Sequence, residues 1–122
     1  MANKSNDLRQ ALGDAFGDNF NSGTLKIYTA GNASLLATFT LAADAFAACT
    51  TAGVVAMNGL PDSVTAGNTG IAAVADLEQG IYTLTGLTVG ESATQVIIDN
   101  TDINATQTVT LNSFSWTESG TA

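Results

Sequence analysis

The segments Thr24-Leu25-Lys26-Ile27-Tyr28 and Leu35-Leu36-Ala37-Thr38-Phe39-Thr40-Leu41 decide the fold class of this chain. Apolar and polar residues alternate along both, as is typical of strands that bury one face. In the second segment, Leu35 and Phe39 share the apolar face with Ala37 and Leu41. The turn residues 30–32 lie between the two segments, which are therefore predicted to form a β-hairpin.

The rest of the chain continues this pattern of short strands separated by turns. Further strands are predicted at residues 53–57, 71–76, 81–85, 94–99 and 107–117. Residues 76–80 are expected to turn the chain, residues 86–90 to turn or bulge, and residues 42–52 to form an irregular connection that places Phe46 in the core. This pattern indicates an all-β fold, a β-sandwich or small Greek-key barrel of about seven to eight short antiparallel strands.

The apolar residues of the last predicted strand, 107–117, change from one side of the strand to the other. Val109 and Leu111 share one face, whereas Phe114 and Trp116 have the opposite parity. Successive side chains of a strand point to opposite faces, so the switch predicts a bulge near Asn112. The alternative is a strand end whose aromatic side chains face a partner.

An amphipathic helix or arm is predicted at residues 5–19, before the β region at 23–117. One helical stripe carries its apolar side chains: Leu8, Leu12, Ala15 and Phe16. Ser5 or Asn6 is expected to cap the first turn. Gly13 and Gly17 each weaken a helix by about 1 kcal/mol relative to alanine. The helix therefore needs to dock, either on its own domain or on a neighbouring subunit, and we expect residues 1–122 to form one domain.

The composition argues against several classes of function. The 122 residues include three Lys or Arg against eleven Asp or Glu, which gives a net charge of −8, with no His and one Cys. Few cations disfavour nucleic-acid binding, and the missing histidines remove the commonest general base and metal ligand. No apolar run approaches the roughly 18 residues of a membrane span. We expect no enzyme activity, no cofactor, no metal site and no membrane partner.

Two acidic segments are the main candidates for chemistry. Asp76 and Glu78 could be the paired carboxylates of a glycosidase, but acidic residues are also common in turns for backbone reasons. Residues 99–104 are rich in Asp and Asn, yet their acids lack the alternate spacing of a calcium loop. We interpret both segments as turns. A sugar-binding role remains open for the aromatic residues Tyr28, Tyr82 and Trp116.

Two groups of motifs resemble a known family. The first comprises Phe20-Asn21-Ser22-Gly23-Thr24-Leu25-Lys26-Ile27-Tyr28, followed by residues 35–41 and Ala43-Asp44-Ala45-Phe46. The second comprises Asp99-Asn100-Thr101-Asp102-Ile103 and Gln107-Thr108-Val109-Thr110-Leu111-Asn112-Ser113-Phe114. In order and spacing they are similar to a family of small virion proteins of tailed bacteriophages, usually encoded beside the major capsid gene.

The resemblance implies a capsid decoration, or cement, protein that binds the outer surface of the assembled head and bridges capsid subunits. The implied partner is the major capsid protein, with assembly in the host cytoplasm and a homo-oligomeric state. The alternative is a tail, neck or fibre protein that binds host glycans. The expected interface or core residues are Leu8, Leu12, Phe16, Phe20, Phe114 and Trp116.

Overall fold

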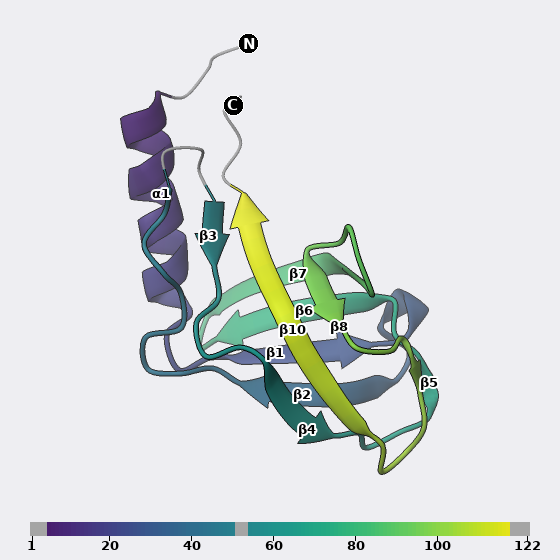
Figure 1. Ribbon diagram of the computed structural model, residues 1–122. Coiled ribbons are helices and arrows are strands. Elements are labelled where there is room, and N and C mark those ends of the chain that lie inside the picture. Colours follow the sequence, from purple (N-terminus) through teal and green to yellow (C-terminus); the bar gives the residue numbers. More distant parts are fainter. Residues whose placement is uncertain (1–4, 51–53, 118–122) are drawn as a thin grey trace.

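A computed structural model of the chain describes residues 5–50 and 54–117 (Figure 1). These ranges contain the helix α1 (Asn6–Asn19), the 3-10 turn η1 (Ala30–Asn32) and the strands β1 (Thr24–Tyr28), β2 (Leu35–Thr40), β3 (Val54–Ala56), β4 (Asp62–Thr65), β5 (Gly70–Ile71), β6 (Val74–Gln79), β7 (Tyr82–Gly90), β8 (Val96–Ile98), β9 (Asp102–Ile103) and β10 (Thr108–Thr117). The predicted helix followed by an all-β region is confirmed.

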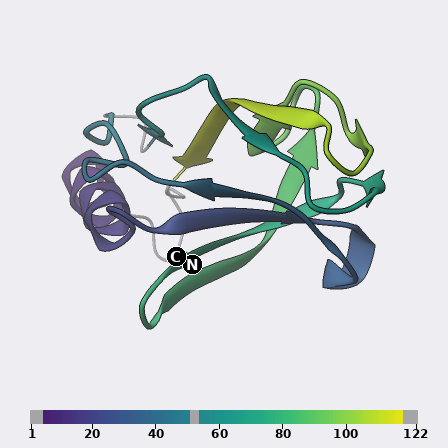
Figure 2. The same cartoon turned by 90° about the horizontal axis from the view of Figure 1, so that it is seen from below.

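The strands form a curled sheet in the order β2-β1-β6-β7-β8-β10-β3, and β4 also pairs with β10. Figure 2 shows the resulting two layers, with β1, β2 and β6 on one side and β8 and β10 on the other. Near the open end of the sheet, the Gly67 N–H donates to the Leu36 carbonyl oxygen at 2.9 Å. The small sandwich or barrel predicted from the alternating segments is therefore present.

One strand pair departs from the expected antiparallel arrangement. The end of β7 pairs with β8 in parallel, with Val89 opposite Val96 and Gly90 opposite Ile97. The chain makes this return through a short loop fastened at its base. The Thr88 N–H donates to Gln95 Oε1 at 3.2 Å, and the Gln95 N–H donates to Thr88 Oγ1 at 3.1 Å. Hydrogen bonds from these two side chains thus stabilise a parallel strand contact that the turn residues of the sequence do not predict.

The core between the layers is apolar, and no polar or charged side chain of the described ranges is buried in it. Leu25 and Ile27 point inward as predicted. Leu35 does not: its side chain is exposed, and Leu36 is buried instead. The register of β1 against β2 shifts beside Tyr28, so Leu36 is an extra residue in β2. The predicted alternation holds from Ala37 onward, since Ala37, Phe39 and Leu41 are buried.

The expected bulge in the last strand is confirmed. The register of β10 against β8 shifts between Leu111 and Ser113. As a result, Val109, Leu111 and Phe114 are all buried in spite of their different parity. The irregular connection at residues 42–50 also places Phe46 in the core, as predicted. The last two residues of that connection, 51–52, lie outside the described ranges.

The predicted turn at residues 76–80 is wrong. β6 continues to Gln79, and the chain turns at Gly80 and Ile81. Ala75 and Leu77 alternate with outward-facing Asp76 and Glu78, so the segment meets the requirement for a half-buried strand. The predicted turn or bulge at residues 86–90 is a bulge at its start, because the register against β6 shifts between Leu84 and Leu87 while β7 runs on to Gly90.

Candidate functional site

A cluster of aromatic rings joins the end of α1 to the β body. Phe16 stacks on Trp116 with ring centroids 5.4 Å apart and planes 15° apart. The Phe16 ring also meets Phe20 at 5.1 Å and Phe46 at 5.5 Å. Phe46 in turn meets Phe114 edge to face at 5.6 Å. Offset and edge-to-face contacts are the favoured geometries of aromatic pairs, so this cluster holds the helix beside the end of β10 (Figure 1).

Two glycines lie on the docked face of α1. A Cβ on Gly13 would overlap Cys49 Sγ and lie 2.9 Å from Val55 Cγ2. A Cβ on Gly17 would lie 3.1 Å from Phe46 Cβ. The helix backbone therefore packs directly on the 45–50 segment and β3. The sequence predicted only the cost of these glycines to helix formation, whereas the structure shows that they permit the close approach.

Polar contacts complete the docking of the helix. Asp14 Oδ1 accepts a hydrogen bond from the Cys49 N–H at 2.7 Å. Gln10 Nε2 donates to the Cys49 carbonyl oxygen at 3.4 Å. At the start of the helix, Ser5 Oγ accepts from the Leu8 N–H at 3.2 Å, which confirms the predicted cap. The helix is thus attached to its own domain by the face that carries Gln10, Gly13, Gly17 and Phe20.

The opposite face of α1 is apolar and open. Its side chains follow the spacing i, i+3, i+4 and i+7 and are all exposed: Leu8, Ala11, Leu12 and Ala15. Leu8 is 47% exposed and Leu12 is 38% exposed. At 3.6 residues per turn these four positions lie opposite the glycine face. We name them the outer stripe. The helix does not use this stripe to dock on its own domain, although its leucines are the largest apolar side chains in that part of the helix.

The six residues expected at an interface or in the core divide into three groups. Phe20 is 5% exposed and Phe114 is 1% exposed, so both belong to the core and not to a partner surface. Phe16 and Trp116 are partly buried in the aromatic cluster. Leu8 and Leu12 lie on the outer stripe and are available to a partner. Sequence periodicity placed Leu8, Leu12 and Ala15 on one stripe, but it also included Phe16, which packs in the aromatic cluster instead. The glycine contacts that leave the outer stripe open could not be predicted from periodicity.

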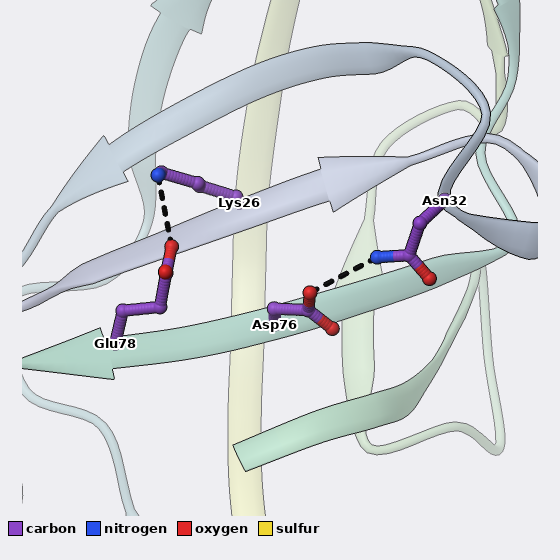
Figure 3. Close-up of polar contacts among 4 residues, drawn as sticks. All are labelled: Lys26, Asn32, Asp76 and Glu78. Atoms are coloured by element: carbon purple, nitrogen blue, oxygen red, sulfur yellow. Dashed lines mark hydrogen bonds and ion pairs between the residues drawn. The ribbon is translucent and has the colours of Figure 1, made fainter. Parts of the chain in front are cut away.

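Asp76 and Glu78 lie on the outward face of β6, and each carboxylate has a partner (Figure 3). Glu78 Oε2 is 2.9 Å from Lys26 Nζ. Asp76 Oδ2 accepts from Asn32 Nδ2 at 3.0 Å, and its Oδ1 accepts from the Gly86 N–H at 3.3 Å. These contacts connect β6 to β1, η1 and β7. They give both carboxylates a structural role in the outer face of the sheet.

The Lys26–Glu78 pair should make stability depend on pH at the alkaline end. A hydrogen bond and the negative charge of Glu78 raise the pKa of Lys26 above its ordinary value of 10.5. The pair therefore stabilises the folded state below pH 10.5, and its contribution is lost as the pH rises through the higher folded-state pKa. We expect Glu78→Gln to unfold at lower urea than the native chain at neutral pH. The difference should shrink above pH 10.5, and a constant difference would contradict this role.

The other acidic candidate, residues 99–104, contains a turn held by a hydrogen bond of its own. Asn100 Oδ1 accepts from the Asp102 N–H at 3.0 Å, as expected for an Asx turn. Within residues 5–50 and 54–117, no group of three or more Cys, Asp or Glu residues is arranged to hold a metal ion. Of the aromatic residues considered for sugar binding, Trp116 is stacked on Phe16 and Tyr82 is 48% exposed. α1, the one α-helix of the described ranges, is too short and too polar to cross a membrane.

No family model, curated protein or solved structure matches this chain.

Proposed function

We propose that this chain is a bacteriophage capsid decoration protein of the cement type. It binds the outer surface of the assembled head and bridges neighbouring subunits of the major capsid protein. It is assembled onto the head in the host cytoplasm and acts as a structural protein without catalysis. The observation that carries this proposal is the outer stripe, an exposed apolar helix face on a helix that is already docked to its own domain.

The outer stripe has the properties of a surface that is covered in an assembly. An isolated helix of about 12–15 residues is marginal in water, so α1 owes its stability to its docking. The docking uses the glycine face and the aromatic cluster, and leaves Leu8 and Leu12 free to contact another protein. Burial of two leucine side chains stabilises a complex by roughly 3 kcal/mol. A rigid, preformed helix face also costs less entropy to bind than a segment that must first fold.

The family resemblance supplies the identity of the partner, and the composition agrees with it. Only 11% of the residues are charged, against roughly 25% in an average globular domain. A surface of small polar side chains can pack against another protein without the desolvation of many charges. A cement protein that binds only the assembled shell stabilises that shell through linkage. Many copies, each with a modest affinity, then resist expansion of the whole head.

Binding to capsids tests the role of the outer stripe. Purified protein is titrated onto empty shells made of the major capsid protein of the same phage, and bound copies and the shell melting temperature are measured. We expect saturable binding and a higher melting temperature. In the double variant Leu8→Glu/Leu12→Glu the affinity should fall about 100-fold, because the apolar contact is replaced by two carboxylates that lose water.

A matched control is available outside helix α1. Leu35 is 37% exposed, close to the 38% of Leu12, but lies on β2. Leu35→Glu should bind shells like the native chain. Equal losses in both variants would show that charge alone weakens binding and would remove the stripe from the proposal. Absence of shell binding by the native chain would overturn the cement role and favour the tail, neck or fibre alternative.

A further inference from the structure

The first half of β7 has an open edge, and we propose that this edge pairs with the same edge of a second copy of the chain. The pairing is antiparallel about a two-fold axis centred on Thr83, and it continues the β2-β1-β6-β7 layer from one copy into the next. This inference rests on the proposed function and extends it, because it names a surface for the homo-oligomeric state that the family resemblance implies. It does not use the outer stripe.

The open edge arises because β7 takes part in both layers. From Tyr82 to Thr88, β7 pairs with β6 on one side, and only Val89 and Gly90 reach β8 on the other. Within the described ranges, no strand pairs with the second edge of the stretch from Tyr82 to Thr85. In Figure 2 the β6–β7 hairpin extends away from the layer that contains β10. The body of the fold therefore leaves this edge accessible.

The register shows which backbone groups face outward. Gln79 and Tyr82 flank the two-residue turn, so they form a hydrogen-bonded pair. The next pair, Glu78 and Thr83, is then of the non-hydrogen-bonded type, in which N–H and C=O point away from the partner strand. Thr83 consequently directs both groups to the open edge. Two copies related by a two-fold axis can exchange these N–H and C=O groups between their Thr83 residues.

The side chains beside Thr83 complement themselves in this arrangement. With Thr83 opposite Thr83 of the second copy, Tyr82 lies opposite Leu84 of the second copy, and the reverse holds by symmetry. These are non-hydrogen-bonded positions, where cross-strand side chains approach most closely. Tyr82 is 48% exposed in the single chain, and Leu84 is partly buried against the core. An aromatic ring beside a leucine on each side of the axis would extend the existing core across the contact.

Charge favours this edge as the meeting point of two acidic chains. Each copy carries a net charge of −8, so most surfaces of two copies repel each other. Residues 81–90 contain no charged side chain. The nearest carboxylates on β6 already have partners, because Glu78 pairs with Lys26 and Asp76 accepts hydrogen bonds from Asn32 and Gly86 (Figure 3). Ile81 at the tip is 90% exposed, which adds an apolar surface without charge.

Sedimentation equilibrium over a range of protein concentration up to millimolar tests the pairing. We expect a reversible monomer–dimer equilibrium, and protection of the Thr83 amide from hydrogen exchange that increases with concentration. Thr83→Pro removes the outward N–H and is compatible with an edge strand. It should weaken the dimer at least about tenfold. Thr83→Val keeps the N–H and should leave the dimer unchanged.

A second pair of variants keeps the test valid if Thr83→Pro does not fold. Tyr82→Asp brings two new carboxylates to the contact and should abolish the dimer, whereas Tyr82→Phe should retain it. A monomer at every concentration would overturn the proposal. So would a dimer that resists Tyr82→Asp, or one whose Thr83 amide is never protected. The dimer should persist in Leu8→Glu/Leu12→Glu, so failure of shell binding and failure of edge pairing are separate results.

Discussion

Phe114→Ala is expected to lower the free energy of unfolding by about 3–5 kcal/mol, as for other fully buried phenylalanines. The Phe114 ring is 1% exposed and packs edge to face on Phe46 at 5.6 Å. Removing it leaves a cavity between β10 and the aromatic cluster that holds α1. Urea unfolding measures the decrease in the free energy of unfolding. Because Trp116 stacks on Phe16, its fluorescence reports whether α1 also detaches from the β body.

The conservative variant Phe114→Leu provides the control for this prediction. It retains most of the buried apolar volume and should cost clearly less than the alanine variant. If Phe114→Ala unfolded at the same urea concentration as the native chain, Phe114 would not be a core residue. It would then return to the group of residues available to a partner.

Gly13→Ala is expected to destabilise the protein by about 2 kcal/mol, although alanine is the better helix former by about 1 kcal/mol. The new methyl group would overlap Cys49 Sγ and lie 2.9 Å from Val55 Cγ2, so the helix must move away from the body. Whether Gly13→Ala raises or lowers the free energy of unfolding shows which property of this glycine matters more, its low helix propensity or its close packing. Helix propensity alone predicts stabilisation, and close packing predicts destabilisation. The midpoint of urea unfolding measures the difference.

Gly67→Ala is the matched control, because nothing lies within 4 Å of a Cβ at Gly67. It should leave stability unchanged or raise it slightly through the unfolded state. Gly17→Ala should fall between the two, since its Cβ would lie 3.1 Å from Phe46 Cβ. A stabilised Gly13→Ala variant would mean that the helix does not dock through its glycine face.

The alternation of β1, the helix with its cap and the bulge in β10 could be predicted from the sequence, because each depends on residues that are close together in the chain. The errors occur where a residue's neighbours lie far away in the chain. Asp76 and Glu78 look like turn residues, but across the sheet they meet Asn32 and Lys26, and the strand continues. The parallel contact of β7 with β8 depends on the bonds between Thr88 and Gln95, which no strand pattern contains.

The candidate site was only partly predictable for the same reason. Helical spacing places Leu8 and Leu12 on one stripe, and an apolar stripe normally docks on the core. Which face docks is decided here by Gly13 and Gly17, whose missing side chains let the backbone approach Cys49, Val55 and Phe46. From the sequence alone, a glycine is only a weak helix former. Its role in close packing depends on the segment that packs against it in the folded chain.

The division of α1 into two faces also bears on how this protein can change over generations. Substitutions at Leu8, Ala11, Leu12 or Ala15 alter an exposed surface and leave the contacts of Gly13 and Gly17 with the body unchanged. This surface can therefore vary one residue at a time while the chain still folds, whereas a side chain added at Gly13 would collide with Cys49 and Val55. Within its 14 residues, α1 thus has one face that can vary and one face that is needed for folding.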